Sequence, residues 1–249
     1  MNKTQFIKNK NWKKYLLEFF MLFLAVFLGF FADNLRDKSS EKSKEREYIH
    51  SLIEDVVLEK INIQKVISYN KIRKTRLDSL SKFCYNYSLE NIDDRKLYYH
   101  YPFSILQRPD FLSANELTMT QLKNAGGMRL IKNKNAIKEI LLYDIQQKKL
   151  EDQQKYYENY HKNSINLGLK IFNHQKVRHM VSLIKTKDTI NLKATNFKLI
   201  QNDQNLLTEF GNVVDMYGGI VAYYNMLLEE KNNQADSLIL KLKKEYKIK

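Results

Sequence analysis

Apolar residues follow two different patterns along this chain of 249 residues. Residues 15–32, YLLEFFMLFLAVFLGFFA, are apolar on every face of a helix, and Glu18 is the one charged residue among them. A helix rises about 1.5 Å per residue and the hydrocarbon core of a bilayer is about 30 Å thick, so about 20 such residues cross it. The pattern predicts a transmembrane helix over residues 15–34. Its expected membrane residues include Tyr15, Glu18, Phe19, Phe23, Phe27, Gly29 and Phe31, and its interface anchors are Trp12, Lys13 and Lys14.

Beyond residue 34 the apolar residues recur every three or four positions, which is the spacing of one helix face. No Gly or Pro occurs from residue 30 to 101, so we expect one long helix over about residues 35–87, with its weakest point at Ser39 and Ser40. Asn70 falls within the stripe, where a polar side chain can fix the register of packed helices. The stripe consists of Ile49, Leu52, Ile53, Val56, Ile63, Val66, Ile67, Leu77 and Leu80.

Two connections and a short helix follow the long helix. Residues 88–112 are rich in Tyr, hold both prolines and lack a helical period, so a loop is expected there. The sequence Ser-Ala-Asn-Glu at residues 113–116 is a capping box, which opens a short helix over residues 113–125. Gly126 and Gly127 end that helix, because glycine is a common stop signal.

The C-terminal half contains two further helical patterns, over about residues 135–177 and about residues 203–247. A polar linker is expected between them at residues 186–202, and a bend in the last helix at Gly218 and Gly219. The whole pattern predicts an all-α fold, in which an N-terminal transmembrane helix continues into an elongated antiparallel helical bundle.

A basic start followed by an apolar core is also typical of a cleavable signal peptide. Cleavage requires small residues in an A-x-A pattern, whereas Phe30 and Phe31 precede Ala32 here, so we interpret the segment as an uncleaved anchor. Five Lys or Arg residues flank the segment on each side, and the positive-inside rule therefore does not decide the orientation. The basic tail, residues 1–14, has no acid and should contact anionic lipid, which favours an extracytoplasmic bundle.

The net charge of +14 arises from 42 Lys and Arg against 28 Asp and Glu. Lys is abundant together with Asn, Ile and Tyr, which we attribute to the composition of the source genome. Nucleic-acid binding requires a basic face, so this dispersed excess gives no reason to expect a nucleic-acid partner. The one tight cluster within the bundle is Lys71, Arg73, Lys74 and Arg76. It is either a solvated helix face or a patch for an acidic partner, and it lies about 50 Å or more from the bilayer by helical rise.

Glu18 is the residue of the apolar segment with a chemical interpretation of its own. It is a proton or ion site, a contact between the spans of an oligomer, or a residue close to the interface that pairs with Lys14 four positions earlier. The third alternative is the one we favour.

Other candidate groups give no catalytic or metal-binding pattern. Glu47/His50 and Glu158/His161 have the Glu-x-x-His spacing of di-iron bundles, but both glutamates face away from the apolar stripes. His174 and His179 lie on different faces of a helix, and the single Cys84 excludes an intramolecular disulfide. Without an activated nucleophile or inward-facing acids, we expect no enzyme activity, no metal and no cofactor.

Two blocks of the sequence resemble a family of uncharacterised bacterial single-pass membrane proteins. The first is Tyr-Leu-Leu-Glu at residues 15–18 with Asn-Leu at residues 34–35, and the second is residues 117–131, LTMTQLKNAGGMRLI. The chain departs from the family at Ala32 and Asp33, where a more polar-aromatic close is usual. The resemblance implies a helical domain of unknown role anchored in the bacterial inner (cytoplasmic) membrane, without catalytic residues to transfer.

Three functions remain open at this stage. The first is a non-catalytic interaction, scaffolding or sensing protein that contacts a protein partner or a second copy of itself. The second is a small-ligand binder or enzyme with a site beneath residues 88–112. The third is a nucleic-acid binder, which requires a bundle in the cytoplasm.

Overall fold

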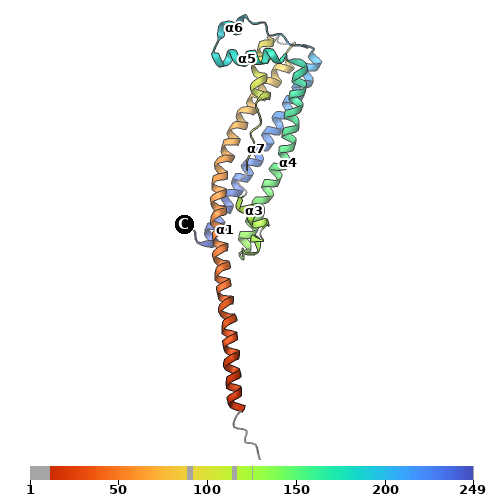
Figure 1. Ribbon diagram of the computed structural model, residues 1–249. Coiled ribbons are helices and arrows are strands. Elements are labelled where there is room, and N and C mark those ends of the chain that lie inside the picture. Colours follow the sequence, from red (N-terminus) through yellow and green to blue (C-terminus); the bar gives the residue numbers. More distant parts are fainter. Residues whose placement is uncertain (1–11, 89–91, 114–116, 125, 249) are drawn as a thin grey trace, which may run out of the picture.

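The computed structural model describes residues 12–88, 92–113, 117–124 and 126–248, and within these residues the fold is all-α. The bundle is elongated, and one helix projects far beyond it (Figure 1). The elements are α1 (Trp12–Tyr85), α2 (Asp94–Tyr101), the π-helix η1 (Pro102–Leu106), α3 (Leu117–Asn124), the 3₁₀-helix η2 (Gly127–Arg129), α4 (Lys134–Ile171), α5 (His174–Thr186), α6 (Thr189–Ala194) and α7 (Gln204–Tyr246).

Helix α1 is unbroken over 74 residues, which corresponds to about 110 Å at 1.5 Å per residue. It contains a segment long and apolar enough to cross a membrane, and none of that segment is buried against the rest of the chain. Ser39 and Ser40 are helical, so the expected weakest point is not a break. From Glu45 onward one face of the same helix is buried, and the helix ends two residues before the predicted limit.

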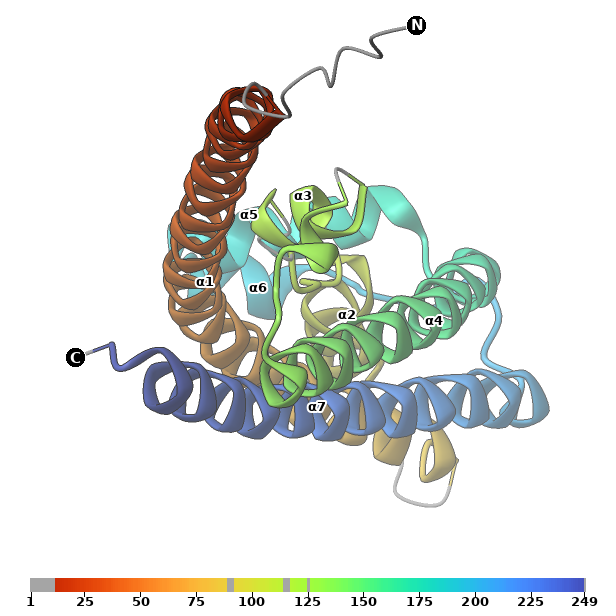
Figure 2. The same ribbon diagram turned by 90° about the horizontal axis from the view of Figure 1, so that it is seen from below.

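The bundle is built around α7, which packs along both α1 and α4. Helices α1 and α4 run away from the apolar segment and α7 runs back towards it, so α7 is antiparallel to both (Figure 1). Seen along the bundle, α7 lies across α1 and α4, and α3 packs against α1 (Figure 2). The predicted antiparallel bundle is confirmed.

The apolar interior is divided into two clusters. The cluster nearer the apolar segment contains Ile49, Leu52, Ile140 and Leu238, and the larger cluster beyond it extends from Ile63 to the far end of the bundle. Between them lies a layer of buried polar residues, Glu59, Gln147 and Lys231.

The loop expected over residues 88–112 contains the helices α2 and η1. Asp93 caps α2 by accepting a hydrogen bond from the backbone N–H of Arg95 at 2.8 Å. The tyrosines of this segment serve as core residues, since Tyr98 and Tyr101 are buried together with Leu97. A loop was predicted because the segment holds both prolines and its apolar residues follow no helical period.

The helix expected over residues 135–177 ends earlier, at Ile171. Phe172 leaves the helix to stack on the Tyr101 ring at a centroid distance of 4.1 Å, and the side chain of Asn173 caps a new helix, α5. The expected polar linker over residues 186–202 contains α6, which Asp188 caps. These caps are the signals that mark the true boundaries.

Glycines at two places have clear roles. Gly126 follows α3 with a φ of +69°, a left-handed conformation that glycine adopts at little cost, and the predicted stop is therefore confirmed. Gly218 and Gly219 lie inside a continuous α7, so the helix is not interrupted where a bend was expected. A Cβ at Gly218 would lie 3.3 Å from Cδ of Lys74, which indicates that this glycine permits a close approach of α1. Residues 114–116 of the predicted capping box lie outside the described residues.

Candidate functional site

The polar layer at mid-bundle joins one residue from each long helix. Glu59 of α1 and Lys231 of α7 are 2% and 1% exposed, and the Lys231 Nζ lies 3.1 Å from Glu59 Oε1. Lys231 also donates to Gln147 Oε1 of α4 at 2.9 Å, and Tyr143 of α4 donates to Glu59 Oε2 at 2.7 Å. The charges are thus paired inside the protein. Such buried pairs can fix how packed helices align along one another, and paired groups are not free to bind a substrate.

Tyr143 is held in its neutral form within this layer. Its pKa is raised by burial and further by the neighbouring Glu59 carboxylate, so the hydroxyl remains a hydrogen-bond donor at neutral pH. Its ring lies below the Lys231 ammonium, with the nitrogen 4.1 Å from the ring centroid.

A second buried polar group is centred on Arg73 of α1, which is 2% exposed. Its guanidinium donates to the hydroxyls of Tyr217 at 2.6 Å and Tyr69 at 2.8 Å, and to the carbonyls of Gln107 and Arg108, both at 2.7 Å. Both carbonyls come directly after η1, where the helical hydrogen bonds have ended, and Arg73 supplies the donor for them. Burial raises the pKa of Tyr217 to about 12, and the hydroxyl is therefore a neutral partner of the cation at pH 7.

Asn70 completes this group and confirms the sequence-based placement of a polar residue in the core. It is fully buried, and its Oδ1 accepts a hydrogen bond of 2.9 Å from the hydroxyl of Tyr157 on α4. Next to it, His161 is half-buried with Nε2 2.7 Å from the carbonyl oxygen of Ile105. Burial lowers the pKa of His161, so the imidazole is neutral at pH 7.

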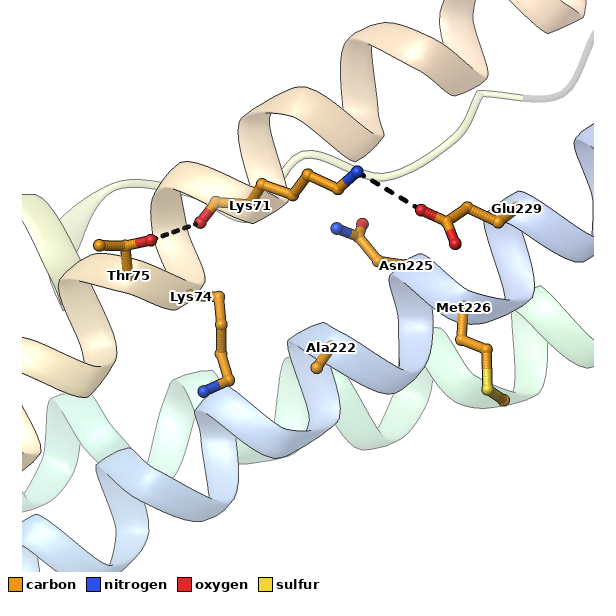
Figure 3. A pocket seen from close by; sticks show the side chains of 7 residues that line it. All are labelled: Lys71, Lys74, Thr75, Ala222, Asn225, Met226 and Glu229. Carbon is orange, nitrogen blue, oxygen red and sulfur yellow. Dashed lines mark hydrogen bonds and ion pairs between the residues drawn. The ribbon is translucent and has the colours of Figure 1, made fainter.

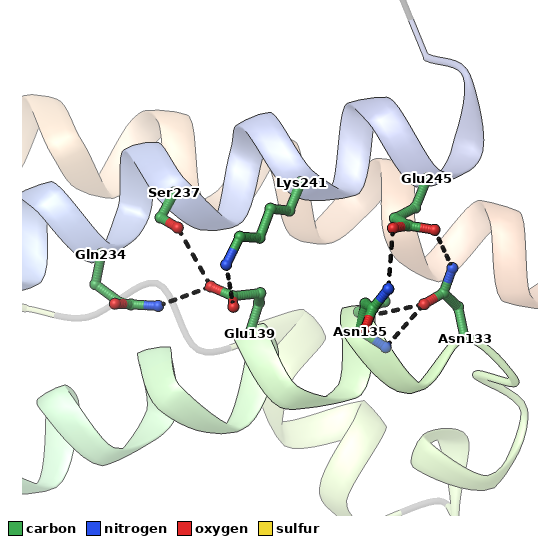
Figure 4. Close-up of polar contacts among 8 residues, drawn as sticks. Asn133, Asn135, Glu139, Gln234, Ser237, Lys241 and Glu245 are labelled. Carbon is green, nitrogen blue, oxygen red and sulfur yellow. Dashed lines mark hydrogen bonds and ion pairs between the residues drawn. The ribbon is translucent and has the colours of Figure 1, made fainter.

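Near the apolar segment, polar contacts join the start of α4 to the end of α7 (Figure 4). The buried Glu139 binds Lys241, and it accepts hydrogen bonds from Gln234 at 3.1 Å and Ser237 at 3.3 Å. Asn133 caps α4 and also donates to the Glu245 carboxylate at 2.6 Å. The groove here has a volume of about 250 Å³, but its carboxylates already have protein donors.

A shallow groove of about 380 Å³ lies on the outer surface between α1 and α7 (Figure 3). Its cations are already paired: Lys71 lies 3.5 Å from Glu229, and Lys74 lies 2.5 Å from Asp78. At its floor Asn225 donates to the carbonyl of Ile67 at 3.2 Å.

The predicted basic cluster is therefore divided into two parts. Lys71 and Lys74 face the groove, whereas Arg73 points into the core and Arg76 donates to the side chain of Gln107 at 3.0 Å. Four residues within one and a half turns cannot share one helix face, and the two arginines serve to hold the segment after α2. The cluster is not one interaction surface.

The predicted membrane residues all lie on the exposed part of α1. Tyr15, Glu18 and Gly29 are exposed, and Phe19, Phe23, Phe27 and Phe31 form a row in which successive ring centroids lie 6.2–6.4 Å apart. Trp12, Lys13 and Lys14 are exposed in the first turn. Among the described residues, Lys14 and Glu18 form no ion pair with each other, so the expected pairing is not present. Residues 1–11 of the basic tail lie outside the described residues.

The histidine pairs are not assembled into a common site. Glu47 and His50 are exposed, and Glu158 accepts a hydrogen bond of 2.7 Å from Gln154. His174 and His179 lie on the surface of α5. No group of three or more His, Cys, Asp or Glu side chains that could hold a metal occurs in the part of the chain that the structure describes.

Sequence reasoning missed Glu59 and Lys231, and it did not foresee that Arg73 is buried, although a signal was present. On α1 the buried positions continue in steps of three and four through Val56, Glu59 and Ile63, and on α7 they continue through Leu228, Lys231 and Ala235. A charged residue that falls in step with an apolar stripe indicates a buried, paired charge.

Comparison of the chain with protein-family models, with curated proteins and with solved structures finds no match. The resemblance drawn from residues 15–18, 34–35 and 117–131 therefore stays a prediction.

Proposed function

We propose that this protein is held in a membrane by one helix and acts through contacts of its bundle with other proteins, without catalysing a reaction. The observation that carries the proposal is the continuity of α1, which runs without a break from Trp12 to Tyr85. An anchor and a core helix that form one rigid element fix the bundle at a defined height above the bilayer. Movement at one end of such an element reaches the other.

The arrangement of the polar groups supports contact over catalysis. Glu59, Arg73 and Lys231 are buried and paired with other protein groups, so they are not available to a substrate. Active sites usually present polar groups of perturbed pKa to a cleft.

The alternative of a ligand site beneath residues 88–112 has less support. The space there is filled by side chains, because Tyr98 and Tyr101 pack with their rings 4.1–5.3 Å from the ring of Phe172, and Phe210 lies against both Tyr101 and Phe172. A ligand would have to displace this aromatic cluster.

The proposed location is the bacterial inner membrane, with the bundle outside the cytoplasm. A reporter fused after Lys249, active in one compartment alone, tests the orientation. Extracytoplasmic activity supports this arrangement. Cytoplasmic activity contradicts it and restores the nucleic-acid-binding alternative.

Site-specific photo-crosslinking tests the proposed mode of action. Suitable positions are large apolar residues that remain 52–70% exposed on the bundle, namely Leu58, Ile61, Ile72 and Leu240. We expect covalent adducts with another protein, or adducts of twice the chain mass if the partner is a second copy. An absence of adducts at all four positions and at the far end of the bundle, in membranes that contain the folded chain, would contradict the proposal.

A further inference from the structure

The end of the bundle opposite the apolar segment concentrates positive charge. We define the distal cap as residues 162–198, which comprise the last turns of α4, the helices α5 and α6, and the start of the connection to α7 (Figure 1). Asp188 is its one acidic residue. Its basic residues are Lys162, Lys170, Lys176, Arg178, Lys185, Lys187, Lys193 and Lys198.

Genome composition does not explain this concentration. The preceding part of α4, residues 134–158, contains five Lys residues and five acidic residues. Two of those lysines form ion pairs, Lys148 with Asp144 and Lys155 with Asp152. The fold brings the segment with a single acid to one end of the bundle.

The charge of the distal cap is not neutralised within the protein. Across the described residues, none of its eight cations forms an ion pair with a carboxylate, and seven of the eight are exposed. The eighth cation, Lys176, is half-buried and donates to the carbonyl of Asn196 at 2.9 Å. The single acid, Asp188, is used as the cap of α6 and accepts from the backbone of Asn191 at 3.0 Å.

Apolar side chains are exposed among these cations. Helix α6 has no buried residue, and its Ile190 is 80% exposed. Leu169 is also more than half exposed, as is Ile200 just beyond the distal cap. Ile190 stands between Lys187 and Lys193 in the chain, and neither lysine has a carboxylate partner among the described residues. An exposed apolar residue with such neighbours matches a partner that presents both carboxylates and an apolar side chain.

Other acidic partners fit this surface less well. The distal cap lies at the Tyr85 end of α1, about 80 Å from residue 32 by helical rise, which is far beyond the screening length for lipid headgroups of the same membrane. Single-stranded nucleic acid binds through exposed aromatic rings, whereas Phe172 and Phe197, the two Phe, Tyr or Trp residues of the distal cap, are 2% and 3% exposed.

We propose that the distal cap is a docking surface for an acidic segment of a partner protein, with Ile190 as its apolar contact. This inference rests on the proposed function and adds to it the place of contact and the chemistry of the partner.

Direct binding of defined probes to the full-length protein in detergent micelles tests the proposal. The first probe is a fluorescent 20-residue peptide of Glu and Leu, the second a 20-residue peptide of Glu and Ser, and the third a single-stranded oligonucleotide of 20 thymidines. Fluorescence anisotropy gives each affinity. We expect the Glu/Leu peptide to bind most tightly, and its binding to weaken as salt is added.

Two matched variants locate the binding. The cap variant replaces Arg178, Lys185, Lys193 and Lys198 by Gln, and we expect it to bind the Glu/Leu peptide about tenfold more weakly. The control variant replaces four exposed lysines of the bundle side, Lys65, Lys148, Lys149 and Lys155, by Gln, and it should bind as the parent protein does.

Ile190→Ser tests the apolar contact. It should weaken the binding of the Glu/Leu peptide about threefold to tenfold and leave the binding of the Glu/Ser peptide unchanged. All substituted residues are exposed, so circular dichroism should report unchanged folding.

The proposal is wrong if the cap and control variants bind the Glu/Leu peptide equally, if Ile190→Ser has no effect, or if the oligonucleotide binds more tightly than either peptide. The last result would assign the surface to nucleic acid. Failure here is distinct from failure of the proposed function, because crosslinking at Leu58, Ile61, Ile72 and Leu240 reports contacts that do not involve the distal cap.

Discussion

Helix α1 places two kinds of apolar surface on one continuous element. Over residues 15–32 the apolar side chains point in all directions and are exposed, as Phe30 is at 73%. Beyond Glu45 they form one stripe, and residues such as Ile49 and Leu77 are fully buried within the bundle. An apolar stripe of this kind is buried by a partner helix, whereas a uniformly apolar surface is typical of a segment whose solvent is itself apolar.

Charged residues sharpen this contrast. In the bundle half of α1, Glu59 and Arg73 each contact polar groups from other elements. In the apolar half, Glu18 is exposed. A change in one half of α1 should therefore alter either membrane association or the stability of the bundle, but not both.

The largest effect is expected from charges placed in the apolar half. Phe23→Asp with Phe27→Asp should abolish membrane association, since an Asp at the bilayer centre costs about 2.5–3.5 kcal/mol. Membrane flotation measures the loss. Leu58→Asp with Ile61→Asp, at exposed apolar positions of the bundle half, is the matched control and should stay in the membrane fraction. Equal behaviour of the two double variants would remove the distinction between the halves.

Lys231→Met should destabilise the bundle by about 3–5 kcal/mol, because it leaves the buried Glu59 carboxylate without its cation. Urea unfolding of the full chain in detergent, followed by circular dichroism, measures the change. Replacing both partners, Glu59→Leu with Lys231→Met, should recover much of the loss. Glu18→Leu, the change of an acid in the apolar half, should leave the unfolding midpoint unaltered. An unaltered midpoint in Lys231→Met would show that the pair contributes nothing.

Glycine substitutions extend the contrast to packing. A Cβ on Gly168 of α4 would overlap the buried Tyr101 ring, so Gly168→Ala should cost about 1–3 kcal/mol. Gly29→Ala meets no atom within 4 Å and should leave the stability of the bundle unchanged. Thermal unfolding of the two variants side by side is the measurement, and similar melting temperatures would contradict the packing of α2 against α4.

The smallest effect is expected on how much stability the fold loses as the pH falls below 7. Burial alone would raise the pKa of Glu139, but the hydrogen bond and charge of Lys241, with Ser237 and Gln234, lower it below its ordinary value. A carboxyl whose folded pKa is lowered stabilises the fold at neutral pH, and this contribution is lost as the pH falls through that pKa.

Glu139→Gln should therefore flatten the fall of the urea midpoint between pH 7 and pH 3, without changing membrane association. A variant profile parallel to that of the parent protein would show that Glu139 does not contribute to the pH dependence.

The sequence predicted the long elements well, because 74 residues without an internal proline and with a clear stripe leave few alternatives for α1. It also placed Asn70 in the core. It failed where short helices depend on single caps, at Asp93, Asn173 and Asp188, and where tyrosines such as Tyr98 replace aliphatic core residues.

The candidate sites were less predictable than the fold. Lys71, Arg73, Lys74 and Arg76 are adjacent in sequence but face different ways, since each residue turns a helix by about 100°. The charge of the distal cap spreads over 37 residues, and it gathers at one end of the bundle only because the chain turns at Phe172 and Lys187.

We propose that residues 15–32 hold an otherwise self-contained bundle in a bilayer. Alkaline carbonate extraction of membranes from cells that express the full chain, compared with a chain that begins at Arg36, tests it most directly. The account predicts that the full chain stays in the membrane pellet and that the shortened chain is soluble and helical. A full chain that is released into the supernatant would contradict it.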